Sequence, residues 1–227
     1  MIPLRDENPN HIMPIINWAI IVVCVSVFIW QVLGGSERYE SIIETYGFVP
    51  ALVRNNSDHY YMFITSMFLH GGLIHLGGNM LYLYIFGDNL EDMCGHLSYL
   101  IFYLVCGISA SLLFMASAWN STMPAIGASG AISGVLAGYV ILFPKVRVMT
   151  AIPIGFFIRV VHVPAFVMIG LWFVYQFLLA IIGAETGVAY WAHIGGFLAG
   201  LVFVKMFARR KHYHPLYYRA AFPEFGR

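Results

Sequence analysis

The chain of 227 residues contains little charge, with 10% charged and 60% hydrophobic residues. A soluble globular domain carries about 25% charged residues, so this composition excludes an ordinary soluble domain. Five long windows lack Asp, Glu, Lys and Arg altogether. These windows are residues 8–36, 59–87, 93–144, 160–184 and 186–204. The scarcity of charge predicts an integral membrane protein.

Carboxylates are also missing from the middle of the apolar windows. Proton relays and cation transporters usually depend on buried carboxylates, and the sequence shows no inverted repeat, so a transporter or channel is disfavoured. No basic stripe indicates a nucleic-acid partner. The three cysteines lack the spacing of metal ligands and are expected to be inert thiols. They are Cys24, Cys94 and Cys106.

The windows are long enough for six membrane-spanning helices of about 20 residues each, because turn formers at 119–124 divide the longest window. The expected helices lie near 14–33, 76–90, 97–118, 129–143, 164–183 and 187–207. The sequence therefore predicts an all-α membrane protein with a six-helix domain at 14–208. Residues 1–13 precede this domain, residues 36–58 form a polar-rich loop, and residues 209–227 form a basic tail.

Basic residues are unequally divided between alternate connecting segments. If the N-terminus is cytoplasmic, ten of them lie on cytoplasmic segments and only Arg38 and Arg54 lie on the opposite side. The ten are Arg5, Lys145, Arg147, Arg159, Lys205, Arg209, Arg210, Lys211, Arg219 and Arg227. The positive-inside rule then predicts that both termini are cytoplasmic.

Several polar residues nevertheless lie within the apolar windows, where burial is costly and each suggests a function. They are His70, His75, Asn79, Ser129, Ser133, Tyr139, Gln176 and His193. Small residues recur every four positions in the fourth and sixth expected helices, which lets two helices approach closely. The two rows are Gly130, Gly134 and Gly138, and Ala192, Gly196 and Gly200. Close approach of these two helices would bring Ser129 near His193. The contact could serve helix packing alone, or the two residues could act together in catalysis.

The fourth expected helix is short. Sixteen residues from Ser129 to Pro144 span about 24 Å, whereas the hydrocarbon core is about 30 Å thick. If Lys145 marks the cytoplasmic boundary, Ser129 lies below the opposite surface, after an irregular segment at 120–128. Irregular backbone at that depth is tolerated along a water-filled cavity, and the N–H groups of a helix start could stabilise an oxyanion there.

His75 and Asn79 are four residues apart and share a helix face, so both could donate hydrogen bonds to an oxyanion. Alternatively, Asn79 bridges helices and His75 caps a neighbouring loop. A zinc site of His70, His75 and His193 is disfavoured, since the chain has no HExxH motif and no carboxylate near them. An α/β-hydrolase elbow is excluded because Ala131 replaces the second glycine of GxSxG.

These motifs resemble the rhomboid family of intramembrane serine proteases, in its bacterial form. The matching segments are PLRDENP, YGFVP (46–50), MFLHGGLIHLGGNMLYLYIFGDNLED (67–92), GASGAISG (127–134) and AHIGGFLAG (192–200). The resemblance implies Ser129 as nucleophile and His193 as general base, without an acidic third member. It also implies an oxyanion hole formed by Asn79, His75 and the Ser129 N–H. Three glycines would support the site: Gly127, Gly130 and Gly196.

The resemblance further implies cleavage of the transmembrane segments of single-span or polytopic membrane proteins, without metal, nucleotide or other cofactor. The expected location is a bacterial inner membrane, with the active site open to the periplasm. The alternative is a non-catalytic rhomboid-like protein that binds membrane clients. This chain lacks the Trp-Arg pair that some members carry in the first external loop. It also has Ser133 where some members place a tyrosine against the histidine, which leaves open what positions the His193 ring.

Overall fold

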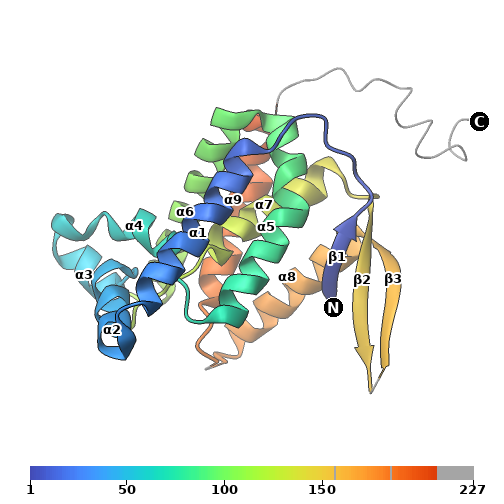
Figure 1. The fold of residues 1–227 in the computed structure, drawn as a ribbon. Helices are drawn as coiled ribbons and strands as arrows, with labels where there is room; N and C mark the ends of the chain where they lie inside the picture. Colours follow the sequence, from blue (N-terminus) through green and yellow to red (C-terminus); the bar gives the residue numbers. More distant parts are fainter. Residues whose placement is uncertain (156, 185, 209–227) are drawn as a thin grey trace, which may run out of the picture.

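The computed structural model describes residues 1–155, 157–184 and 186–208. Six long helices dominate the described part of the chain (Figure 1), and each end lies within four residues of its expected position. They are α1 (Ile15–Val32), α5 (Leu73–Cys94), α6 (His96–Ser117), α7 (Ser129–Leu142), α8 (Ala165–Ile181) and α9 (Tyr190–Phe207). The basic tail at 209–227 lies outside the described residues.

The apolar character of these helices fits a membrane bundle. By length and composition, α1, α6 and α9 can each cross a membrane, while α7 and α8 are apolar but shorter. Many of their large apolar side chains face outward, such as Val22, Leu171 and Val202. Outward-facing apolar side chains are stable in contact with lipid, so the structure is that of a helical integral membrane protein.

Helix α7 lies in the interior of the bundle, against α5, α6 and α9 (Figure 1). Every residue from Gly130 to Tyr139 is buried. Its neighbours contribute fully buried side chains such as Phe86, Tyr103 and Cys106 to one continuous apolar core. The residue that begins α7 is therefore held by packing on several sides.

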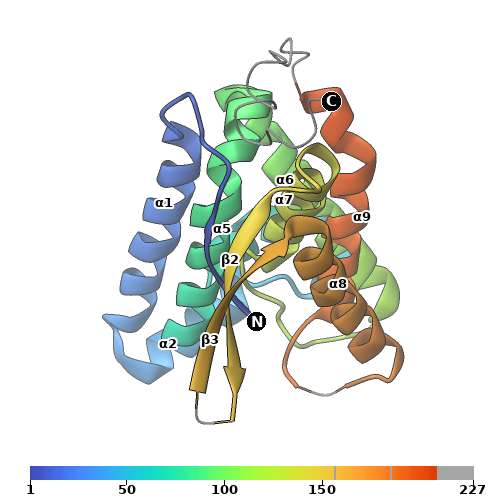
Figure 2. The same ribbon diagram turned by 90° about the vertical axis from the view of Figure 1, so that its right-hand side faces the viewer.

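The all-α prediction is wrong for two segments, which form an antiparallel three-stranded sheet in the order β1-β2-β3. Strand β1 (Ile2–Asp6) pairs with β2 (Arg147–Ile154), which turns at Gly155 into β3 (Phe157–Pro164). The sheet lies beside α5 and α8 (Figure 2). The segment at 147–164 is rich in β-branched residues, which favour strands, and its basic residues indicate only the side of the membrane.

The expected polar-rich loop at 36–58 is mostly helical. It contains α2 (Gly35–Tyr46) and α3 (Pro50–Asn55), followed by a short 3₁₀ turn at Ser57–His59. Its charged residues occupy the outer face of α2, while Ile42 is buried. Two short elements, α4 (Met62–Thr65) and a 3₁₀ turn (Ser66–Phe68), then lead to α5. The polar composition of this segment thus marks exposed helix faces.

The N-terminal segment is attached to the far end of α5. The Glu91 carboxylate accepts hydrogen bonds from the Ile16 and Asn17 N–H groups at 3.0 and 2.7 Å. The first N–H groups of a helix have no partner within it, so this carboxylate caps α1. The Asp92 carboxylate accepts from the His11 N–H at 2.9 Å. Helix α5, which carries His75 and Asn79 near its beginning, is therefore fixed at its opposite end.

Candidate active site

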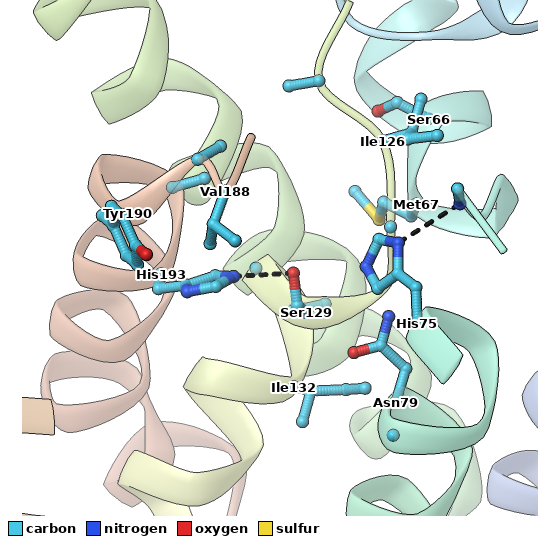
Figure 3. Close-up of a pocket in the computed structure, with 18 of the residues that line it drawn as sticks. Ser66, Met67, His75, Asn79, Ile126, Ser129, Ile132, Val188, Tyr190 and His193 are labelled. Carbon is cyan, nitrogen blue, oxygen red and sulfur yellow. Dashed lines mark hydrogen bonds between the residues drawn. The ribbon is translucent and has the colours of Figure 1, made fainter. Parts of the chain in front are cut away.

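Ser129 and His193 meet at the start of α7. Ser129 is the first residue of that helix, and its Oγ lies 2.8 Å from Nε2 of His193 on α9 (Figure 3). The His193 side chain is almost fully buried, at 9% exposure, while Ser129 is half-buried. The structure thus brings together the two residues that the sequence analysis proposed as nucleophile and base.

The two helices come this close because glycines face each other across the contact. A Cβ built on Gly200 would lie 2.3 Å from the Gly134 carbonyl oxygen. A Cβ on Gly130 would lie 2.6 Å from the Ala110 Cβ of α6, so the packing of α7 against α6 also needs a glycine at position 130. The predicted rows of small residues therefore pack α7 between α6 and α9.

The His193 ring contacts a second side chain that the sequence analysis named only as a polar residue in a span. Its Nδ1 lies 2.7 Å from Oε1 of Gln176, which is buried on α8. The Trp172 ring, one helical turn earlier on α8, lies 5.9 Å from the imidazole at an angle of 34°. Only the spacing of Trp172 and Gln176 on one helix face could have signalled this arrangement.

Ser133 does not contact the histidine ring by hydrogen bonding. It is fully buried, and its hydroxyl donates to the Ser129 carbonyl oxygen at 2.7 Å. A serine that bonds the carbonyl four residues earlier is a common arrangement inside helices. Ser133 therefore belongs to the packing of α7.

His75 and Asn79 lie on the opposite side of Ser129 from His193 (Figure 3). The Asn79 Nδ2 is buried and has no hydrogen-bond partner among the described residues. The Nδ1 of His75 accepts a hydrogen bond from the Gly71 N–H at 3.2 Å, so His75 does cap the neighbouring loop. That bond leaves the His75 Nε2 available to face the site, which makes the two interpretations of His75 compatible.

Gly127 passes directly against these two side chains. It has a φ of +123°, and a Cβ there would lie 2.8 Å from the His75 ring and 3.5 Å from the Asn79 Nδ2. Only glycine adopts this backbone conformation without strain. The segment before α7 therefore lies against the Asn79 amide and the His75 imidazole, which are about 50 residues earlier in the sequence.

The loop before α5 is held at the His70 backbone by two side chains, Gln31 of α1 and Tyr39 of α2. The His70 N–H donates to the Gln31 Oε1 at 3.1 Å, and the His70 carbonyl oxygen accepts from the Gln31 amide and the Tyr39 hydroxyl. The His70 ring lies 5.2 Å from the His75 ring, whereas His193 lies across the site. Within the described ranges, no group of three His, Cys, Asp or Glu side chains is placed to hold a metal ion.

A cavity of about 1050 Å³ is lined by Ser129, His193, His75, Asn79 and Gln176, whereas His70 and Ser133 are not among its lining residues. Its walls include residues of α5, α6, α7, α8 and α9 and of the segment 125–127. Apolar residues such as Met67, Ile126 and Ile132 form the rest of the wall near Ser129. A concave apolar site with a few convergent polar groups is typical of a binding or active site.

Comparison with known proteins matches residues 57–210 to the Rhomboid domain. The chain belongs to the rhomboid family. It is similar to "Rhomboid protease GluP" of Bacillus subtilis, at 30% identity over 173 residues, covering 76% of this chain and 31% of that protein. "Rhomboid protein 1, mitochondrial" of Saccharomyces cerevisiae is 32% identical over 154 residues, covering 62% of this chain and 40% of the relative.

Another relative is named as inactive. "Inactive rhomboid protein 1" of Drosophila melanogaster is 27% identical over 96 residues, covering 42% of this chain and 7% of that protein. The chain spans about a third of the length of the first curated relatives it matches. The family therefore includes both named proteases and an inactive member, and the activity of this chain depends on its own site.

Proposed function

We propose that the chain is an intramembrane serine endopeptidase that cleaves transmembrane segments of other membrane proteins. The observation that carries the proposal is the 2.8 Å contact between the Ser129 Oγ and the His193 Nε2. The unpartnered Asn79 amide on the other side of the serine supports it, because an oxyanion would supply the missing acceptor.

In the proposed reaction, the Ser129 oxygen attacks the carbonyl carbon of the scissile peptide bond while His193 Nε2 takes the hydroxyl proton. The resulting imidazolium gives this proton to the leaving amine, and an acyl-enzyme on Ser129 remains. A water molecule, deprotonated by His193, then hydrolyses the ester and restores the serine. These steps use two reacting side chains and no cofactor.

The negative oxygen of the tetrahedral intermediate would be stabilised from the side opposite His193. The Asn79 amide and the backbone N–H of Ser129 are the proposed donors, with His75 as a third. Ser129 begins α7, so its N–H has no partner within the helix, and the helix dipole favours negative charge there. Loss of one such donor costs about 3–4 kcal/mol in the barrier.

The proposed membrane arrangement has six spanning helices, with both termini cytoplasmic and the site open to the periplasm of a bacterial inner membrane. Residues 14–208 form the protease domain, between an N-terminal segment and the tail at 209–227. The 14 residues of α7 extend about 21 Å, less than the roughly 30 Å of hydrocarbon, which supports a helix start below the membrane surface. The cavity above it would admit the water that hydrolysis requires.

The proposed substrates are single-span or polytopic membrane proteins. A peptide bond within an intact helix is shielded by helical packing, so the substrate segment must unwind before Ser129 can attack. The cavity is large enough for several residues of an extended segment, and its apolar wall suits side chains that leave the lipid.

The decisive experiment uses purified full-length chain in liposomes with a set of model single-span substrates. Wild-type protein should cleave them, while Ser129→Ala and His193→Ala should each lose at least about 1,000-fold in kcat/KM. Ser133→Ala is the matched control on the same helix and should keep most of the activity. Labelling by a fluorophosphonate probe should follow the same order.

The alternative, a non-catalytic protein that binds membrane clients, gives a different result. Wild-type protein would then cleave no better than Ser129→Ala across all substrates, while both forms would bind the same substrates equally. That outcome would exclude the protease. Probe labelling that persists in Ser129→Ala would place the nucleophile at another residue.

A further inference from the structure

Both ring nitrogens of His193 have side-chain partners, and the partners come from different helices. Nε2 lies 2.8 Å from the Ser129 Oγ on α7, and Nδ1 lies 2.7 Å from the Gln176 Oε1 on α8. Gln176 is 7% exposed, so water cannot readily replace its amide. The imidazole is therefore held between a hydroxyl and an amide oxygen.

The chemistry of these partners determines which ring nitrogen carries the proton. An amide oxygen can only accept a hydrogen bond, so Nδ1 must be the protonated nitrogen that donates to it. In neutral histidine the other nitrogen, Nε2, then has a free lone pair and accepts the hydroxyl proton of Ser129. This tautomer is the one that a general base needs for the proposed attack.

In soluble serine proteases a buried aspartate performs this task. In the described part of this chain, no carboxylate makes a hydrogen bond to the His193 ring. A charged side chain at membrane depth is costly, whereas a neutral amide accepts the same hydrogen bond at a lower desolvation cost. An amide thus suits a site surrounded by lipid.

We propose that Gln176 is a positioning residue for His193 that holds the productive tautomer, as the third member of an otherwise two-residue catalytic arrangement. The inference rests on the proposed protease function. Trp172, one turn earlier on the same face of α8, packs against the ring and fixes its rotation. Ser133, which occupies the position of a ring-stacking tyrosine in some relatives, makes its hydrogen bond to a backbone carbonyl instead.

This arrangement makes the alignment of the base depend on α8. The cavity is lined by Trp172, Tyr175 and Gln176 of that helix, while its opposite face is exposed at Leu171, Val174 and Leu178. A displacement of α8 by about 1 Å would lengthen the Nδ1 contact beyond hydrogen-bond range. The helix that shapes the substrate cavity therefore also determines whether His193 is ready to act.

The first test compares variants of Gln176 in the liposome cleavage assay. Gln176→Met preserves the approximate volume but removes the acceptor, and should lower kcat by roughly 10- to 1,000-fold with KM changed less than about twofold. Gln176→Glu keeps an acceptor oxygen in either protonation state and should retain kcat within about tenfold of wild type. Leu178→Met, on the exposed face of α8, is the matched control and should behave as wild type.

The second test measures the tautomer without using activity. In protein with ¹⁵N-labelled histidine, the His193 signals, assigned by comparison with His193→Gln, should show protonated Nδ1 and unprotonated Nε2 in wild type and in Gln176→Glu. Gln176→Met should show an increased fraction of the other tautomer. Thermal unfolding within about 3 °C of wild type would establish that the variants are folded.

The outcomes separate this inference from the proposed function. Failure of the wild type itself to cleave would refute the protease. An active wild type whose Gln176→Met variant keeps full kcat and an unchanged tautomer would overturn the role of Gln176. Loss of activity in Gln176→Glu equal to that in Gln176→Met would also overturn it, because keeping an acceptor oxygen would then fail to preserve activity.

Discussion

Gly196 of α9 lies against the backbone of Gly130 in α7, so closely that a Cβ built on Gly196 would be 1.8 Å from the Gly130 carbonyl oxygen. Real Cβ atoms essentially never lie within 3.0 Å of a heavy atom from a residue that is distant in the chain. Ser129 is the neighbour of Gly130, and His193 lies one turn before Gly196. The distance between the serine and the histidine is therefore set by this glycine contact.

Gly196→Ala should separate α7 from α9 and weaken both stability and activity. Insertion of a methyl group into a packed core costs about 1–3 kcal/mol, and here the obstacle is a backbone atom that cannot rotate away. We expect a lower unfolding midpoint in detergent and a loss of cleavage of at least about tenfold. Gly77→Ala, an exposed position of α5 with open space around it, is the control and should be unaffected.

Asn79→Ala should lower activity without lowering stability. The Asn79 Nδ2 has no hydrogen-bond partner among the described residues, so its removal breaks no hydrogen bond donated by that nitrogen. In the proposed transition state the same group donates to the oxyanion, and its loss should reduce kcat by about 100- to 1,000-fold with little change in KM. Steady-state cleavage and thermal unfolding measured together test this. A matching fall in unfolding midpoint and activity would instead assign Asn79 a structural role between helices.

Gly127→Ala should impair the site through two separate effects. Its φ of +123° is unfavourable for alanine, and the new Cβ would press on the His75 ring at 2.8 Å. Gly35→Ala shares a positive φ, +79°, but a Cβ there would meet no side chain of the described residues within 4 Å apart from its chain neighbours, so it reports backbone strain alone. We expect Gly127→Ala to lose activity at least about tenfold more than Gly35→Ala, measured as kcat/KM. Equal losses would show that contact with His75 is unimportant.

The positions of the helices followed from the sequence because uncharged windows and turn formers are local features. The approach of Ser129 to His193 was also predictable, since the rows of small residues on the two helices match. The pairing of β1 with β2 was not, because it joins segments about 145 residues apart and the sequence shows no sign of their register. Helix α2 was missed because its charged residues were taken to indicate a loop.

The partner of the His193 ring shows why part of the site required the structure. Gln176 is one of several polar residues within the expected spans, and the sequence does not show which of them contacts His193. Which ring nitrogen faces which side chain depends on the rotation of α8 and α9 about their axes. A polar residue on an apolar helix therefore marks a candidate, while its role depends on packing between helices.

The N-terminal strand provides a pH-dependent contribution to stability. Asp6 of β1 accepts hydrogen bonds from the Tyr139 hydroxyl and, at 3.3 Å, from the Asn89 amide. Its pKa is raised from 3.8 to about 7, chiefly by burial; the Tyr139 hydrogen bond and Arg5 oppose the shift, and the nearby Asp88 adds to it. Between these values the folded protein keeps a proton that the unfolded chain releases, so stability should fall as pH rises from about 4 to about 7 and then level off.

Asp6→Asn removes this titration while preserving an oxygen that can accept from Tyr139. The difference in unfolding midpoint, wild type minus Asp6→Asn, should therefore fall by at least about 2 °C between pH 5 and pH 8. Glu37→Gln, on the exposed helix α2, is the matched control for loss of one carboxylate and should leave the pH dependence of wild type unchanged. A difference between wild type and Asp6→Asn that stays constant with pH would mean that Asp6 is already ionised in the folded protein at pH 5, and that burial of β1 does not affect its protonation.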